Sequence, residues 1–228
     1  MHIVVIIAII IAILYGPHIW ATRTFRRYSL KRDDIPGSGS ELAIHLLKEL
    51  DMQHVKVEQT KKDNDHYNIE EKAVKLSPKN FNDNSLTAIT VAAHEVGHAI
   101  QHHRNEATFN ASLRLESVAN VIQKIGGGVL YILPVLAIIT RNPVIGLLTI
   151  VTGICVMGIS VIVQLINLPV EYDASFNKAL PILFEGNYIN KKDQPAAKRI
   201  LKAAALTYVA GSLSSLLNIF RWFTLFRR

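Results

Sequence analysis

Cysteine is nearly absent from this chain of 228 residues: Cys155 is the only one, and it lies in an apolar run. A single cysteine excludes a framework of intrachain disulfides and a zinc site built from several thiolates. Aromatic residues are also few, at 7%. The net charge of +7 comes from basic residues beside apolar segments rather than among aromatic ones, as is typical of charge that flanks a membrane. We therefore expect no nucleic acid among the partners.

The first apolar segment, residues 3–20, has no Lys or Arg before it, unlike the apolar core of a cleavable signal peptide. Five basic residues follow it: Arg23, Arg26, Arg27, Lys31 and Arg32. The positive-inside rule then places the N-terminus outside and residue 21 onward in the cytoplasm. We predict an uncleaved transmembrane anchor.

Long apolar segments also fill the second half of the chain. Half of all residues are hydrophobic and the mean hydropathy is +0.23, which is high for a soluble domain and indicates membrane spans. Residues 125–140 and 144–168 flank the turn sequence Arg141-Asn142-Pro143 and predict a transmembrane hairpin; a hairpin buried in a soluble protein is the alternative. Residues 200–220 are apolar and rich in small residues, which suits a membrane helix. A full span would place the basic residues after it outside, against the positive-inside rule, so an interfacial or re-entrant course is the alternative.

The segment His94-Glu95-Val96-Gly97-His98 carries the most information about function. On a helix, residues four apart share one face, so these two imidazoles can hold one Zn²⁺. Glu95 can then take a proton from a water that the metal activates. The neighbours are small or apolar and predict a buried helix, whose histidines need partners that a metal supplies. The alternative is that the motif occurs by chance and that the two histidines are core residues whose hydrogen bonds are satisfied within the protein. Gly97 costs about 1 kcal/mol relative to Ala, which close packing or substrate access would justify.

Short elements are expected around this metal helix. In chain order we predict a helix from residue 41 capped by Ser40, a strand over 55–60, a polar turn over 61–68, a strand over 73–77, the metal helix over 86–103 and an amphipathic helix over 110–124. The two strands make a short β-ribbon. The strand just before the metal helix is a candidate to pair with substrate backbone; a plain ribbon is the alternative.

A catalytic zinc site needs a third protein ligand. The candidates are His102, His103, Glu106, Glu116 and Glu171. Glu116 lies on a predicted helix 18 residues after His98. Glu171 directly follows the apolar hairpin, which crosses out and back, so its ends return to the cytoplasmic side. Pro169 is expected to open a new helix there, and Asp173 to accept the free ring N–H of a ligand histidine. Glu171 is favoured, and Glu116 stays open.

Three segments resemble one family, the YugP-type bacterial neutral zinc metallopeptidases of membranes. They are Val91–Gln101, Leu168–Ser175 and Ala203–Ala210. Two segments that precede the metal helix, Asp65-His66-Tyr67 and Lys75-Leu76-Ser77-Pro78, also resemble that family. The resemblance implies a gluzincin-like site with His94, His98 and Glu171 as zinc ligands and Glu95 as the base. It places the chain in a bacterial inner membrane.

Together these features predict a membrane-anchored zinc endopeptidase with its site at the cytoplasmic membrane surface, acting on peptides or proteins, membrane proteins included. The alternatives are a zinc-holding membrane adaptor without turnover and a hydrolase of non-peptide substrates. The candidate oxyanion donors are Tyr172, His66, Tyr67, Arg114 and Tyr208. The oligomeric state is open.

The predicted fold is mainly α, with transmembrane helices around the metal helix and a small α+β gluzincin-like domain. Its regions are an anchor (1–20), a catalytic region (21–124), the hairpin (125–168), a helical segment with the third ligand (169–199) and a C-terminal membrane helix with a basic tail (200–228).

Overall fold

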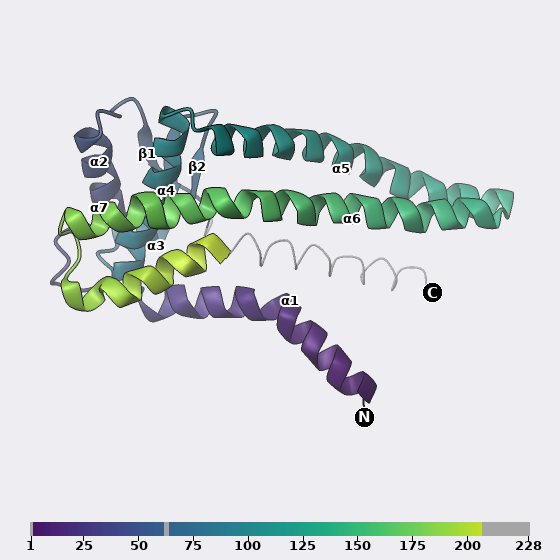
Figure 1. Ribbon diagram of the computed structural model, residues 1–228, viewed down its shortest axis with the longest axis horizontal. Coiled ribbons are helices and arrows are strands. Elements are labelled where there is room, and N and C mark those ends of the chain that lie inside the picture. Colours follow the sequence, from purple (N-terminus) through teal and green to yellow (C-terminus); the bar gives the residue numbers. More distant parts are fainter. Residues whose placement is uncertain (1, 62–63, 207–228) are drawn as a thin grey trace.

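A computed structural model describes residues 2–61 and 64–206, without the side chains of residues 2–11, 13, 14, 157 and 160. The fold is mostly helical, and the long helices extend to one side of a smaller region that holds the strands (Figure 1). The elements are α1 (His2–Arg27), α2 (Gly39–Glu49), β1 (Lys56–Gln59), β2 (His66–Asn68), β3 (Ala73–Leu76), α3 (Pro78–Asn82), α4 (Leu86–His103), α5 (Ala107–Thr140), α6 (Pro143–Tyr172), the π-helical η1 (Asp173–Ala179), α7 (Leu180–Glu185) and the 3₁₀ turn η2 (Lys191–Asp193), followed by helical residues 194–206.

Helix α4 spans the residues predicted for the metal helix, and Ser85 caps it by accepting a hydrogen bond from the Ala88 N–H at 3.1 Å. The prediction of Ser40 as the cap of α2 is wrong. Ser38 takes that place in a capping box with Glu41, while the Ser40 hydroxyl donates to the Phe81 carbonyl at 2.7 Å. The box satisfies two N–H groups at once, which a lone serine cannot do.

The predicted ribbon is a three-stranded sheet of order β1-β3-β2. Strand β1 pairs parallel to β3, and β2 pairs antiparallel to it. The polar stretch read as a turn contains β2. Since β3 is paired on both sides, the strand just before α4 has no edge to offer a substrate; β2 has no second partner among the described strands.

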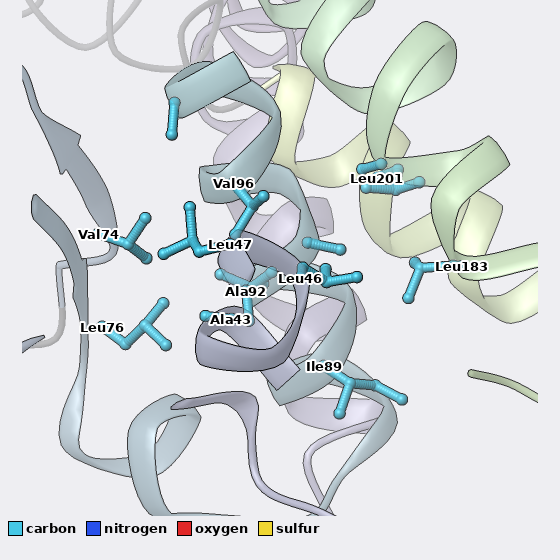
Figure 2. Close-up of a cluster of buried hydrophobic side chains, with 14 of the residues drawn as sticks. Ala43, Leu46, Leu47, Val74, Leu76, Ile89, Ala92, Val96, Leu183 and Leu201 are labelled. Atoms are coloured by element: carbon cyan, nitrogen blue, oxygen red, sulfur yellow. The ribbon is translucent and has the colours of Figure 1, made fainter. Parts of the chain in front are cut away.

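The core lies where α2, β3 and α7 pack around α4. Figure 2 shows Leu47 of α2, Val74 of β3, Val96 of α4 and Leu183 of α7 converging on this cluster. All residues from Leu86 to Gln101 in α4 are buried. Such enclosure fixes the helix on every face, so its polar side chains are held in fixed positions.

Helices α5 and α6 lie side by side and extend away from the core (Figure 1). Both are long and apolar enough to cross a membrane, and at most 6% of the most apolar 18-residue stretch of each helix is buried within the protein. Ile138 and Ile139 are 75% and 71% exposed. The alternative of a hairpin buried in a soluble core therefore does not fit. Residues from 207 onward, which include most of the predicted C-terminal membrane helix, lie outside the described residues.

The helices are more continuous than predicted. Helix α5 runs without a break through the expected boundary at residue 124, and Pro169 lies inside α6 instead of opening a new helix. Beyond Tyr172 the chain continues as η1, a π-helical stretch. The wider π-helical turn shifts which side chains face α4.

Candidate metal centre

Helix α4 presents His94, Glu95 and His98 together in its buried middle. Their exposed fractions are 4%, 6% and 8%. The two imidazole rings meet edge to face with centroids 4.7 Å apart, and their Nε2 atoms are 3.3 Å apart. The i, i+4 spacing thus brings two ring nitrogens to one point, as the sequence motif predicts.

Glu171, from the end of α6, meets both rings. Its Oε2 lies 3.3 Å from His94 Nε2 and its Oε1 lies 3.4 Å from His98 Nε2. One donor atom from each of the three residues lies within 4.8 Å of the others, and all three side chains are buried. Oε2 nevertheless makes no hydrogen bond of acceptable geometry. A buried carboxylate oxygen without a hydrogen bond, beside two imidazole nitrogens, is a donor set that fits Zn²⁺.

The other candidate third ligands lie elsewhere. His102 faces Tyr67, whose hydroxyl is 2.9 Å from its Nδ1. The His103 ring lies tilted against the His54 ring, with centroids 5.6 Å apart, and Glu106 pairs with Lys178 at 3.1 Å. Glu116 lines the same cavity as the cluster without joining it.

Each histidine ring has a polar partner on its other nitrogen. The Ser175 hydroxyl lies 3.0 Å from His94 Nδ1 and 3.3 Å from the Leu201 carbonyl, to which it donates, so its oxygen is free to accept from the ring. Gln101 Oε1 lies 3.0 Å from His98 Nδ1. Such bonds fix the tautomer that leaves Nε2 available to bind a metal. The sequence reasoning missed both residues, although Gln101 stands one turn after His98.

The expected direct bond from Asp173 to a histidine ring is not found in the described part of the chain. Asp173 accepts from Gln101 Nε2 at 2.8 Å and from Lys178 and Asn177. Gln101 also donates to the Val170 carbonyl at 2.9 Å. The longer glutamine side chain thus stands between His98 and the carboxylate, and Asp173 reaches the ring only through it.

The buried charges affect one another strongly. Burial raises the pKa of the Glu95 carboxyl, while the charges of His94 and His98 oppose that rise. Burial would lower the pKa of His98, but the charge and hydrogen bond of Glu171 raise it above its ordinary value. The Glu95 carboxyl therefore holds a proton more readily than an exposed glutamate does.

Gly97 allows η1 to pack against the metal helix. A Cβ at this position would lie 2.7 Å from the Ala174 carbonyl oxygen, which is closer than real Cβ contacts. The close packing that the sequence suggested for Gly97 is therefore present. It brings Ser175 of η1 within reach of His94.

Replacing Gly97 with alanine is expected to destabilise the protein by about 1–3 kcal/mol, because α4 and η1 must separate. Thermal unfolding in detergent measures this. Gly127→Ala in α5 is the control, because a Cβ there meets nothing within 4 Å and helix propensity favours alanine by about 1 kcal/mol. An unchanged melting temperature for Gly97→Ala would contradict the packing argument.

The cluster opens into a cavity of about 900 Å³. Asp65, His66 and Tyr67 line it from the sheet side. Tyr172 is 56% exposed and stacks on Phe176, and neither it nor Arg114 is among the residues lining this cavity. Tyr208 lies outside the described residues. Of the candidate oxyanion donors, His66 and Tyr67 thus share the cavity with Glu95.

Known proteins with similar sequences are described as zinc peptidases or membrane proteases. Residues 2–227 match the model of a family described as "Putative neutral zinc metallopeptidase". A curated protein of Bacillus subtilis (strain 168), "Putative membrane protease YugP", is 32% identical over 204 residues, which cover 89% of this chain and 86% of that protein. No solved structure matches. The chain therefore belongs to this neutral zinc metallopeptidase family.

Proposed function

We propose that the chain is a membrane-anchored, zinc-dependent endopeptidase with a gluzincin-like site. The observation that carries the proposal is the buried cluster of His94, His98 and Glu171, with Glu95 beside it, at a cavity large enough for a peptide segment. The three cluster residues would hold the metal. Two imidazoles and one carboxylate are a donor set typical of catalytic zinc sites, in which three protein ligands would hold the metal.

The chain's own residues supply the proton transfers. Zinc, when bound, would polarise the substrate carbonyl and acidify water at the site. Glu95 takes the proton of the attacking water and passes it to the leaving nitrogen. Its place in the cavity lining, beside the three cluster residues, supports this role. His66 or Tyr67 donates a hydrogen bond to the oxyanion, a role supported by their place in the cavity lining.

Strand β2 is the candidate to hold substrate backbone. It lies at the edge of the described sheet, and two of its residues, His66 and Tyr67, line the cavity. An extended peptide that adds to this edge would gain main-chain hydrogen bonds with little dependence on sequence. The edge takes over the role first expected of the strand before α4.

The site lies at the cytoplasmic surface of the membrane in this proposal. The apolar, exposed hairpin of α5 and α6 supports insertion, and the basic residues after the apolar run of α1 support a cytoplasmic location for residue 21 onward. Glu171 then follows the returning span. The natural substrates are peptides or membrane proteins whose cleavable segments reach this surface.

Cleavage of an unstructured peptide library by the purified full-length protein in detergent tests the proposal. Zinc-loaded protein is expected to cleave, chelator-treated protein to be inactive, and zinc added back to restore cleavage. Absence of cleavage by protein with one zinc per chain would overturn the peptidase proposal in favour of a metal-stabilised adaptor. Cleavage of only non-peptide amides or esters would favour a different hydrolase.

Replacing Gln101 with leucine is expected to weaken zinc binding about 10–100-fold, because His98 Nδ1 loses its partner. Zinc affinity is measured by competition with a chromogenic chelator. Gln53→Leu, at an exposed position, is the control and is expected to bind zinc normally. Equal zinc affinity in the two variants would show that Gln101 does not position the ring.

A further inference from the structure

A second cavity lies apart from the metal centre, between two helix faces. It measures about 560 Å³ and lies where the end of α1 runs beside helical residues 194–206 (Figure 1). Its lining residues are Trp20, Arg23, Thr24, Arg27, Phe176, Lys198, Arg199 and Lys202. The spacing i, i+3, i+4, i+7 on α1 and i, i+1, i+4 on the second helix puts each set on one face.

The lining carries five positive charges and no negative one. None of the five cations makes an ion pair within residues 2–61 and 64–206. The contacts found are weak: Arg27 and Lys198 lie 5.6 and 5.7 Å from the rings of Tyr28 and Phe184, and Arg199 lies 3.5 Å from the Tyr28 hydroxyl. All five are exposed in the protein alone, whereas the partly buried Arg32 pairs with Asp34 and Asp193. Clustered cations without counter-charges repel one another, and a multivalent anion would offset this repulsion.

The position of the cavity along α1 indicates which anion is available. Trp20 ends the apolar run of this helix, and tryptophan favours the headgroup level of a bilayer. Arg23 and Arg27 follow within about 10 Å along the helix axis. With α1 in a membrane, the five cations lie at the depth of the lipid phosphates, where basic pockets between helices bind anionic headgroups.

We propose that this cavity binds the phosphate-bearing headgroup of an anionic membrane phospholipid. The cations of the two helices contact the phosphate, and Trp20 and Phe176 contact the start of the acyl region. The bound lipid would hold α1 against the helical segment after η2. The proposal does not depend on turnover at the metal centre.

Trp20 provides a direct optical probe, because Trp222 is the only other tryptophan in the chain. In full-length protein carrying Trp222→Phe, in a neutral detergent, Trp20 emission is titrated with dihexanoylphosphatidylglycerol, dihexanoylphosphatidylcholine and inorganic phosphate. Phosphatidylglycerol is expected to give a saturable change at the lowest concentration. Arg199→Gln combined with Lys202→Gln is expected to weaken its binding about tenfold, because two of the five charge contacts to the phosphate are lost.

Two further variants make the comparison specific. Lys48→Gln combined with Lys191→Gln removes the same charge at exposed positions outside the cavity and is expected to bind like the parent. Arg23→Gln combined with Arg27→Gln tests the opposite wall, independently of how the first pair folds. Equal binding of phosphatidylcholine, or equal binding by the cavity and control variants, would overturn the site. Inorganic phosphate binding as tightly as phosphatidylglycerol would overturn the lipid as its source.

Discussion

Replacing Glu95 with glutamine is expected to lower peptide cleavage by about 10²–10⁴-fold while the zinc content stays at the wild-type level. Glutamine keeps the size of the side chain but cannot accept and return a proton, which is the share of the rate that a general base supplies. Glu95 is buried beside the cluster without being one of its three donors, so the substitution leaves the three proposed metal ligands intact.

Cleavage rate and zinc per chain are measured on the same preparation. Glu116→Gln is the matched control, because Glu116 lines the same cavity, and it is expected to retain activity. Loss of zinc from the Glu95→Gln protein would assign Glu95 a structural role instead. Full activity in that variant would remove it from the mechanism.

Replacing Glu171 with glutamine is expected to weaken zinc binding by more than the roughly 100-fold upper effect expected for Gln101, because an anionic ligand is lost rather than the partner of a ligand. The variant keeps two histidines whose Nε2 atoms are 3.3 Å apart, and these retain weak binding. Chelator competition measures the affinity, and cleavage is expected to be lost at zinc concentrations that saturate the wild-type protein.

Glu116→Gln again distinguishes the alternatives, since sequence reasoning alone left Glu116 as a second candidate ligand. Normal zinc affinity is expected for this variant. Normal affinity in Glu171→Gln together with a loss in Glu116→Gln would transfer the ligand role to Glu116. The cavity would then have to rearrange to bring Glu116 to the two histidines.

Sequence patterns predicted the helices best where apolar residues continue over long segments and where the spacing of two histidines implies a helix. The metal helix was predicted at residues 86–103 and is found as Leu86–His103, and the two long apolar helices were also expected. Strand β2 was missed because its three residues follow a stretch rich in Asn, Asp and Lys, and only pairing with β3 makes them a strand. Such pairing is tertiary and leaves no local signal.

The metal-donor residues of the candidate site were predictable from the sequence, but the residues that hydrogen-bond to them were not. The spacing of His94 and His98 predicts convergence on one helix face, whereas the meeting of Glu171 with them depends on the path of α6. The π-helical stretch explains why Ser175, and not Asp173, meets a histidine ring. A change from α to π winding after Tyr172 alters the facing of every later residue, and no composition signal marks it.

The path of α6 also limits how this protein can be divided. Two of the cluster residues come from α4 and the third from the far end of the hairpin, 73 positions after His98. A water-soluble fragment that ends before the hairpin would carry His94, Glu95 and His98 but not Glu171. Shortening the protein by removing its apolar helices would therefore remove one of the three candidate metal ligands, and tests of metal binding need the whole chain in detergent or lipid.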